Sequence, residues 1–444
     1  MKEMKVLTVG GGGREHAIVE AFHRAGSEIF AVMKNANPGI IARASKYKLV
    51  DETKVEDVCA FAKECGVELA FVGPEAPLAA GLTDALEKIG IKVASPSKDA
   101  ARIETSKTFM RDLVEKYKIP GNVVYRSFDN AADAKAYIKP LGTKYVVKPV
   151  GLTGGKGVKV MGEHMKCTED AEKYIDEIFS GNIGGAGVII EEKLEGEEFT
   201  QMVFCDGKTI APMPLVQDHK RAYEGDTGPN TGGMGSYSEA DHLLPFITAE
   251  ERQKSLEIIQ AVIDALAKEG CPYKGVLYGQ FMLTVDGPKI IEFNARFGDP
   301  EAMNVLSILE SNFEDVCKQI ADGKLKGDVK FANKATVCKY AVPKGYGTSN
   351  VDSGREISFD MENLAKSKAI LYYANINKVE NTLITGSSRT AAMVGVANST
   401  DEAEWNSEVG LSCINCDYIF VRHDIGKASL IRKRVDHMAR LRGQ

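Results

Sequence analysis

The segment IIEFNARFGDPEAM, which begins at Ile290, gathers polar and charged side chains at the point where an apolar strand ends. Successive side chains of a strand point to opposite faces of its sheet, so Ile290, Glu292 and Asn294 are expected on one face. Ile291 and Phe293 are expected on the other face. One carboxylate and one amide oxygen therefore point in the same direction, as ligands of a shared cation would.

The preceding strand, GQFMLTV, extends this polar face, and the connection contains the turn-forming pair DG. A three-residue connection over residues 285–287 would pair Gln280 with Glu292. Hard oxygen ligands beside a polyphosphate suit Mg²⁺, which combines a few carboxylates with phosphate oxygens and water. We predict a divalent metal site at Gln280, Glu292 and Asn294. The alternative is a strand end that satisfies its own polar groups.

A second candidate site is the glycine-rich stretch YVVKPVGLTGGKGVKV, whose β-rich flanks on both sides indicate a hairpin. Its tip consists of Gly154, Gly155, Lys156 and Gly157. This is not a Walker A loop, because Lys156 is followed by glycine and no helical pattern follows. A glycine tip can close over a polyphosphate while Lys148 supplies a fixed positive charge from the strand. The alternative is an ordinary glycine hairpin with solvated lysines.

A third candidate is the cluster VGGGGREHA, which follows a strand and opens a helix, a setting in which backbone N–H groups attract an anion. The dinucleotide fingerprint is incomplete, because Glu15 stands where its third glycine belongs, and this weakens a nicotinamide enzyme as an alternative. Arg14 is a cation in the first helical turn, where the helix dipole disfavours it, so a bound anion would explain it.

Glu75, in VGPEAPL, lies at the carboxyl end of another strand. Ligands of open α/β sheets bind at this edge, so Glu75 is a candidate ligand-binding residue. The alternative is that its charge only complements the N-terminus of the helix that follows.

The elements that position these residues predict several domains, because 444 residues exceed the roughly 100–200 of one domain. Strand and helix patterns alternate as far as Glu104, which predicts a parallel sheet covered by helices. From Thr105, the expected cap of a helix that stops before Pro120, strand-rich segments with glycine turns take over. Polar and glycine-rich residues at 322–327 precede a third, mainly β unit with a terminal helix.

Composition narrows the class of protein. The formal net charge of −6, with 27% charged residues, argues against an electrostatic nucleic-acid binder. No apolar run approaches the ~20 residues of a membrane span, and the first residues are unlike a secretory signal, so the cytoplasm is expected. Nine cysteines indicate reduced thiols rather than a disulfide framework. The single CxxC pair, Cys413 and Cys416, is not expected to bind metal.

These motifs together resemble the ATP-grasp ligases, in which two α+β subdomains hold ATP. The resemblance rests on Lys107 in SKTFMRD, Lys148, the GGKG tip, IIEEKLEGEEFT and IIEFNARFGDPE. Within that superfamily, GGGGREHA, GPEAPLAAG, DHKRAYEGDTGPNTGGMG and above all RFGDPEAM are similar to motifs of the phosphoribosylamine-glycine ligases, or glycinamide ribonucleotide synthetases. The match runs in order over most of the chain.

The resemblance implies an α/β and α+β multidomain fold. It comprises a Rossmann-like substrate domain at 1–104, an ATP-grasp domain at 105–328 with a mobile lid subdomain at 126–198, and a mainly β domain at 329–444. The implied reaction is phosphorylation of the glycine carboxylate by ATP, followed by attack of 5-phosphoribosylamine on the acyl phosphate. Glycinamide ribonucleotide, ADP and phosphate are the products. Mg²⁺ or Mn²⁺ is the implied cofactor. The expected partners are the small-molecule substrates, with no nucleic acid and no membrane, and a monomer is the expected state.

The resemblance also implies roles for individual residues. ATP would be contacted by Lys107, Lys148, Gly154, Gly155, Lys156, Gly157, Glu191, Leu194 and Glu198. Phosphoribosylamine would be contacted by Gly12, Gly13, Arg14, Glu15, Pro74, Glu75 and Leu78. Glycine would lie near Asp218, Lys220 and Arg296. The metal would be held by Gln280, Glu292 and Asn294. Catalysis would involve Lys148, Lys156 and Arg296, although Arg296 could instead be a partner of Glu292.

Two alternatives remain at this point. The chain could be another ATP-grasp ligase of purine synthesis with a different acyl substrate, which RFGDPE and GPEAPL disfavour. It could also be a nucleotide-binding protein without turnover, which the retained lysines and Glu292 disfavour. The segment ITGSSRTAAMVG departs from the glycine-rich TSGGRVL form of many relatives, which leaves the ligand contacts of the third domain open.

Overall fold

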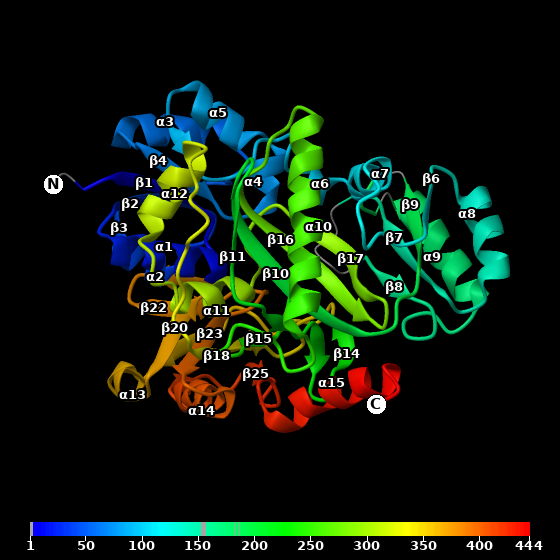
Figure 1. Ribbon diagram of the computed structural model, residues 1–444. Coiled ribbons are helices and arrows are strands. Elements are labelled where there is room, and N and C mark those ends of the chain that lie inside the picture. The colour runs from blue at the N-terminus through cyan, green and yellow to red at the C-terminus, as the bar shows by residue number, and fades with distance from the viewer. Residues whose placement is uncertain (1–2, 152–156, 182, 186) are drawn as a thin grey trace.

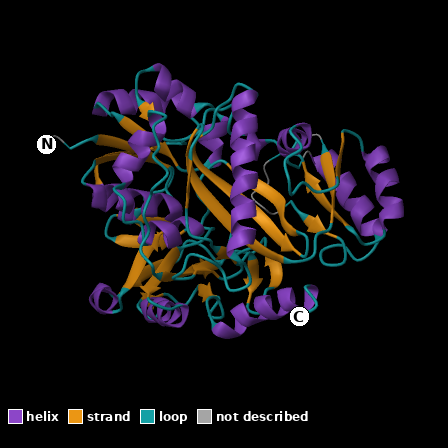
Figure 2. Cartoon of the chain, viewed as in Figure 1, coloured by secondary structure: helices purple, strands orange, loops and turns teal. Residues whose placement is uncertain are grey.

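The computed structural model describes residues 3–151, 157–181, 183–185 and 187–444. In Figure 1 the first part of the chain lies at the upper left, a small separate sheet lies at the right, and the last part of the chain lies below. Colouring by secondary structure shows helices and strands in every part, as expected for a mixed α/β chain (Figure 2). Among the described residues, no helix is long and apolar enough to cross a membrane.

The first part is a five-stranded sheet ordered β3-β2-β1-β4-β5, and all of its strand pairs are parallel, which confirms the Rossmann-like prediction. Its strands are β1 (Lys5–Val9), β2 (Glu28–Met33), β3 (Ala44–Leu49), β4 (Leu69–Val72) and β5 (Lys92–Val93). Its helices are α1 (Gly13–Ala25), α2 (Pro38–Arg43), α3 (Val55–Cys65), α4 (Glu75–Ala79) and α5 (Leu82–Lys88). Because β1 and β4 are neighbours, the turns that lead into α1 and α4 meet at one edge of the sheet.

The central part is a four-stranded antiparallel sheet ordered β11-β10-β16-β17. Its strands are β10 (Glu197–Asp206), β11 (Ile210–Pro212), β16 (Lys274–Thr284) and β17 (Gly287–Asn294). The long helix α10 (Ala249–Lys268) crosses one face of this sheet (Figure 1), and α12 (Phe313–Ala321) packs on the other face. Helix α11 (Glu301–Ser307) precedes α12 in the chain.

Two short helices, α6 (Arg102–Thr105) and α7 (Lys107–Lys116), join the first part to the centre. The cap of α7 is Ser106, whose hydroxyl accepts a hydrogen bond from the backbone N–H of Phe109. The prediction of Thr105 as the cap was therefore wrong by one residue, because Thr105 completes the preceding helix. The predicted stop before Pro120 is confirmed.

The small separate sheet is antiparallel and ordered β6-β9-β7-β8. Its elements are β6 (Tyr125–Phe128), α8 (Ala131–Ile138), the 3₁₀ turn η1 (Lys139–Leu141), β7 (Tyr145–Pro149), β8 (Lys159–Val160), α9 (Thr168–Gly181) and β9 (Val188–Glu192). It has an apolar core of its own, in which Val147 and Ile190 of the sheet pack with Ile175 of α9. The antiparallel pairing of β7 with β8 confirms the predicted hairpin; the tip residues 152–156 lie outside the described residues.

The last part contains two antiparallel sheets, which confirms its mainly β character. The larger sheet contains β12 (Gln217–Asp218), β15 (Gly235–Ser238), β18 (Ala335–Pro343), β20 (Ala369–Tyr373), β23 (Ala391–Ala397) and β25 (Ile419–Val421). The smaller contains β19 (Glu356–Phe359), β21 (Ile376–Val379), β22 (Thr382–Thr385) and β24 (Ile414–Asn415). The helices are α13 (Met361–Lys366), α14 (Thr400–Leu411) and α15 (Ala428–Leu441). Because β12 and β15 come from the 105–328 region, the larger sheet draws on two regions of the sequence.

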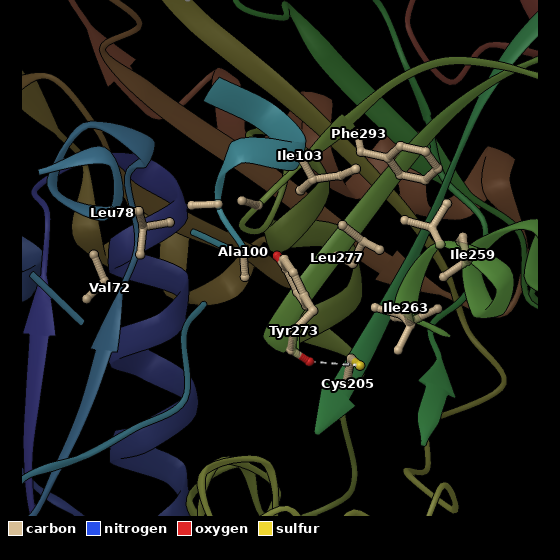
Figure 3. Close-up of a cluster of buried hydrophobic side chains, with 14 of the residues drawn as sticks. Val72, Leu78, Ala100, Ile103, Cys205, Ile259, Ile263, Tyr273, Leu277 and Phe293 are labelled. Carbon is tan, nitrogen blue, oxygen red and sulfur yellow. Dashed lines mark hydrogen bonds between the residues drawn. The ribbon is translucent and has the colours of Figure 1, made fainter. Parts of the chain in front are cut away.

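One apolar core connects the parallel sheet with the central sheet. Figure 3 shows Val72, Leu78 and Ala100 of the first part close to Ile103, which continues the cluster toward Leu277 and Phe293 of the central sheet. Ile259 and Ile263 of α10 close the cluster on the far side, and the Cys205 thiol donates to the Tyr273 carbonyl oxygen at 3.1 Å. The two parts are therefore packed as one body.

A buried ionic cluster joins the small sheet to the centre. The guanidinium of Arg111, on α7, donates to the Glu191 carboxylate at 2.8 Å and to the carbonyl oxygens of Ile290 and Ile291, both at 3.0 Å. The ammonium of Lys148 donates to the second Glu191 oxygen at 2.5 Å. Burial by itself would raise the pKa of Glu191, but Arg111 and Lys148 outweigh it and lower this pKa to about 2.

We expect Glu191→Gln to lower the melting temperature, because it leaves two buried cations without their counterion, a loss on the order of 3–5 kcal/mol. A carboxylate whose pKa is depressed on folding stabilises the protein above its unfolded pKa of 4.5 and loses that contribution as the pH falls toward about 2. The difference in melting temperature between wild type and variant should therefore shrink between pH 4.5 and pH 2. Glu195→Gln, at an exposed position nearby, is the control. A constant difference across this range would contradict the assignment.

Candidate active site

A cavity of about 360 Å³ opens where the first part, the central part and the last part of the chain meet. We call the last part, residues 329–444, the third part. Many of the predicted site residues line it: Arg14, Pro74, Glu75, Lys107, Asp218, Lys220, Glu292, Asn294 and Arg296. Residues that were not predicted also line it, including Glu104, Tyr278, Asp299, Glu301 and Arg389. The charged groups are those of a site for a small polar ligand rather than for an apolar one.

The floor of this cavity is the polar face of β16 and β17. Gln280 pairs with Glu292 across these strands, as predicted, and Tyr278 pairs with Asn294. The reason differs from the prediction, since the connection is a two-residue turn, and a bulge beyond Gln280 restores the pairing. The same bulge moves Ile290 to the apolar face opposite Phe281, so its predicted place beside Glu292 was wrong.

Gln280 is fully buried and its amide is used inside the protein. Its oxygen accepts hydrogen bonds from the hydroxyls of Tyr278 and Thr200, and its nitrogen donates to Glu198 at 2.9 Å. It does not line the cavity, whereas Glu292 and Asn294 do. The prediction of Gln280 as a metal ligand is therefore not supported by its contacts. The interaction with Glu198 gives it a positioning role.

The oxygen donors that face the cavity fit a divalent cation only in part. Glu292 offers one carboxylate and Asn294 one amide oxygen, which also accepts a hydrogen bond from Arg296 at 3.3 Å. No group of three or more His, Cys, Asp or Glu side chains suited to a metal occurs among the described residues. This donor set matches Mg²⁺ or Mn²⁺ when the remaining ligands are phosphate oxygens and water.

Two lysines supply positive charge on the side of the small sheet. Lys107, at the start of α7, lines the cavity and donates to the Gly151 carbonyl oxygen at 2.7 Å, and burial lowers its pKa. Lys148 lies on β7, where Glu191 holds its ammonium group. Gly157 is described and its carbonyl oxygen accepts from Tyr174 at 2.7 Å, whereas the rest of the predicted tip, with Lys156, lies outside the described residues.

The adenine and ribose predictions concern β9, β10 and the segment between them. The side chain of Glu191 turns inward to Arg111 and Lys148, which leaves only its backbone for a base. Leu194 follows β9, is half-buried and does not line the cavity. Glu198 accepts from Lys220 at 3.0 Å as well as from Gln280.

Asp218 carries an incomplete hydrogen-bond set. Its Oδ1 atom is buried and has no partner among the described residues, and the nearest ammonium group, that of Lys220, lies 3.8 Å from Oδ2. Burial raises the pKa of Asp218 to about 7; Lys220 opposes this rise, and nearby Glu301 and Glu198 add to it. Lys220 remains charged, because Asp218 and Glu198 raise its pKa although burial would lower it. A ligand that donates hydrogen bonds would complete this pair.

Arg296 is oriented by two carboxylates from the first part of the chain. Its Nη2 atom donates to Glu104 at 2.8 Å, and its Nε atom lies 3.7 Å from Glu75 without a hydrogen bond. Glu104 also accepts from the backbone N–H of Ala295 at 2.7 Å. Arg296 and Glu292 have no direct ion pair within the described residues, so the sequence alternative of a Glu292 partner is not supported.

A second cavity, of about 520 Å³, lies beside the first. It is lined by the turn before α1, by residues near the end of β2 and by the third part: Gly11, Gly12, Gly13, Glu15, Lys34, Asn35, Glu52, Ala374, Asn375, Asn377 and Ser388, among others. Five residues line both cavities: Arg14, Pro74, Glu75, Asp299 and Arg389. We call these five residues the shared wall.

The charge of Arg14 is balanced within the protein. Its Nε atom donates to Glu15 at 2.5 Å and its Nη1 atom donates to the Phe297 carbonyl oxygen at 3.1 Å. A bound anion is therefore not needed to explain the position of Arg14, and its contact with a substrate stays a prediction. Glu15 also accepts from the Gly12 N–H at 2.9 Å, so it caps α1. Both residues still line the second cavity.

Leu78 does not reach either cavity. Its side chain is fully buried in the core between the first and central parts (Figure 3). Its side chain therefore anchors α4 in the core, and the predicted contact with a substrate is not supported by its position. Pro74 and Glu75 at the start of the same helix do line both cavities.

Arg389 is a site residue that the sequence did not indicate. It belongs to the segment SSRT of the third part, yet its Nη1 atom donates to the carbonyl oxygens of Gly232 at 2.5 Å and Asp299 at 2.6 Å. Its Nη2 atom lies 3.1 Å from the Asp299 carboxylate. No local pattern around an isolated arginine in a turn signals such contacts, since they join segments that are far apart in the sequence.

Known families and relatives match this chain over most of its length. The descriptions of the matching family models are the N, ATP-grasp (A) and C domains of phosphoribosylglycinamide synthetase, over residues 4–104, 105–302 and 336–428. The phosphoribosylamine-glycine ligase of Methanocella arvoryzae is 51% identical over 444 residues, covering 99% of this chain and 100% of that protein. That of Methanocaldococcus jannaschii is 51% identical over 445 residues, again covering 99% and 100%.

Solved structures agree. The crystal structure of the phosphoribosylamine-glycine ligase from Thermotoga maritima matches with a TM-score of 0.81 and 25% identity, covering 95% of this chain and 100% of that one. A biotin carboxylase from Campylobacter jejuni matches with a TM-score of 0.76 at 14% identity over 99% of both chains, which is a likeness of fold alone. With three family models in sequence and half of its residues identical to those of full-length relatives, this chain belongs to the phosphoribosylglycinamide synthetase family of ATP-grasp ligases.

Proposed function

We propose that this protein joins glycine to 5-phosphoribosylamine at the expense of ATP, giving glycinamide ribonucleotide, ADP and phosphate in purine synthesis. The observation that carries the proposal is the pair of cavities with a shared wall. A reaction between an activated acid and a sugar amine requires two binding sites that meet at the atoms to be joined. The names of the relatives agree with this reaction.

In the proposed reaction the first cavity receives the triphosphate and glycine. Lys107 and Lys148 neutralise charge on the phosphate oxygens, together with Lys156 of the hairpin tip. Glu292 and Asn294 would hold Mg²⁺ or Mn²⁺, which supplies further charge neutralisation during phosphoryl transfer. No side chain has to act as a nucleophile, because the glycine carboxylate itself attacks the terminal phosphorus.

Glycine fits between Asp218, Lys220 and Arg296. The unpartnered Asp218 oxygen would accept from the glycine ammonium group, which in turn keeps this carboxyl ionised. The unsatisfied Nε atom of Arg296 and the ammonium of Lys220 would face the glycine carboxylate. The orphan atoms on both sides of the cavity thus match the two charged ends of glycine.

The second cavity suits the sugar phosphate. The N-terminus of the 13-residue helix α1 favours an anion there, and Lys34 adds positive charge that Asp51 and Glu52, each 3.4 Å from its ammonium group, partly balance. Asn35 already donates to the carbonyl oxygens of Gly11, Ala374 and Ile376, so its amide oxygen is the atom that it would offer to a hydroxyl group. Because Arg14 is already paired, its role at this site is to fix the wall and add residual positive charge. We retain the domain limits 1–104, 105–328 and 329–444, a lid at 126–198, a monomeric state and the cytoplasm as predictions.

The alternative of a different acyl substrate has one observation against it. Asp218 Oδ1 and Arg296 Nε both lack a partner among the described residues and line the same cavity, which suits a ligand that carries both an ammonium group and a carboxylate, as glycine does. The alternative of a protein without turnover would leave Glu292 without a role in the protein itself, since Glu292 accepts no hydrogen bond from another described side chain.

The proposed function predicts that ADP release depends on both glycine and phosphoribosylamine. A coupled assay for ADP with ATP and Mg²⁺ should give the full rate only when both are present, because the acyl phosphate formed from glycine waits for the amine. Omitting either substrate should reduce the steady rate at least tenfold. Robust turnover with bicarbonate in place of glycine would instead support the alternative with another acyl substrate.

A second prediction concerns the metal. Glu292→Gln keeps the shape of the side chain but removes the anion, so Mg²⁺-dependent turnover should fall by orders of magnitude, while the melting temperature without metal stays unchanged. Asp286→Asn, at the exposed turn of the same hairpin, should change neither quantity. A destabilised Glu292→Gln variant whose remaining activity responds to Mg²⁺ like the wild type would rule out the metal role.

A further inference from the structure

The shared wall contains two carboxylates, Glu75 and Asp299, and they differ in how they are held. Asp299 accepts a hydrogen bond from the hydroxyl of Tyr340 at 2.5 Å and lies 3.1 Å from the Nη2 atom of Arg389. Its own carbonyl oxygen also accepts from Arg389 at 2.6 Å. Asp299 is therefore fixed on two sides and serves the structure of the wall.

Glu75 is held much more loosely. Its carboxylate accepts no hydrogen bond from another side chain of the described residues, and its closest cation is the Nε atom of Arg296 at 3.7 Å. A third of its side chain is exposed. It is the first residue of α4, directly after Pro74, so its backbone is fixed at the wall while the carboxylate faces ligands on both sides.

The other carboxylates around the first cavity are either held by neighbouring groups or line that cavity alone, as Asp218 does although its Oδ1 atom has no partner among the described residues. Glu104 holds Arg296 and the backbone of Ala295. Glu301 is buried and accepts from Tyr278 at 2.9 Å. Glu292 lines only the first cavity, on the side of the phosphates. Among the described residues, Glu75 is thus the carboxylate that lines both cavities and accepts no hydrogen bond from another side chain.

We propose that Glu75 is a catalytic residue, whose carboxylate takes the proton that the sugar amine loses when its nitrogen attacks the glycyl carbonyl carbon. This inference rests on the proposed function, because it assumes that the amine arrives from the second cavity and the acyl phosphate forms in the first. The shared wall is the place where these two groups have to meet.

The step balances as follows. The nitrogen lone pair forms the new C–N bond, and the bond between the carbonyl carbon and the phosphate oxygen breaks, so that phosphate leaves with the electron pair. The proton on nitrogen passes to an oxygen of Glu75, which later returns it to water. No oxidant, reductant or further reactant is needed.

The surrounding charges are compatible with this role. Burial would raise the pKa of Glu75, but Arg296, Arg14 and Arg389 together lower it, so Glu75 is ionised and able to accept a proton. A carboxylate of reduced basicity is sufficient, because the nitrogen gains positive charge as the C–N bond forms and becomes strongly acidic. Glu104 holds Arg296 through its Nη2 atom, while the Nε atom of Arg296 lies on the side of Glu75. In the proposed reaction Arg296 would lie beside the departing phosphate.

Rapid-quench measurement of a single turnover tests the proposal, with all three substrates and Mg²⁺ at saturation. In Glu75→Gln, ADP should form on the enzyme within about threefold of the wild-type rate, whereas glycinamide ribonucleotide should form at least about a hundredfold more slowly, which is the usual contribution of a general base. The KM for phosphoribosylamine should change less than about threefold. Glu75→Asp, which keeps a carboxylate, should recover part of the amide-forming rate.

Glu56→Gln is the matched control, because Glu56 is an exposed acidic residue in the first turn of another helix of the same part, α3. It should match the wild type in both steps. The proposal is overturned if Glu75→Gln slows ADP and product formation equally, if it raises only the KM for phosphoribosylamine, or if product forms at the wild-type rate. A wild-type enzyme that forms no glycine-dependent ADP would instead remove the proposed function itself.

Discussion

The site depends on the hydrogen bonds that the buried guanidinium of Arg111 donates. This guanidinium donates to the carbonyl oxygens of Ile290 and Ile291, at the bulge of β17, and to Glu191 on β9. A bulge leaves backbone carbonyls outside the ladder of the sheet, and buried carbonyls require donors. Arg111 meets this requirement and, through Glu191, connects Lys148 of the small sheet with the strand that carries Glu292. One side chain, that of Arg111, therefore sets the position of the small sheet relative to the cavity floor.

In the cavity walls, too, charged groups are satisfied by other groups of the protein. Almost every buried charge has a partner inside the protein: Arg14 with Glu15, Arg296 with Glu104, and Arg389 with Asp299. Native proteins rarely leave buried polar atoms unsatisfied, so the exceptions are informative. Here they include Asp218 Oδ1 and Arg296 Nε, which belong to residues that line the same cavity. These atoms define what the protein lacks until a ligand arrives, namely one donor and one acceptor.

Periodicity in the sequence was sufficient for the parallel sheet and for the shared face of Glu292 and Asn294, because both follow from local alternation. It failed at Ile290, since a bulge changes the face of a residue without a signal in residue type. The contact predicted for Leu78 came from the family resemblance instead, and a motif match does not show which side of a short helix is buried. Glu104 and Arg389 could not be found by local reasoning, since their partners lie about 190 and 90 residues away and only the tertiary fold brings them together.

The larger sheet of the third part is completed by β12 and β15, which come from much earlier in the chain. The boundary drawn along the sequence therefore differs from the boundary drawn by hydrogen bonds. A recombinant chimera that exchanged residues 329–444 between relatives would place a foreign β18 against the resident β15, and a fragment ending near residue 328 would expose an unpaired strand edge. Four residue pairs between β15 and β18 therefore constrain the exchange of residues 329–444 during evolution. The unit that can be inherited independently includes β12 and β15 and is larger than residues 329–444.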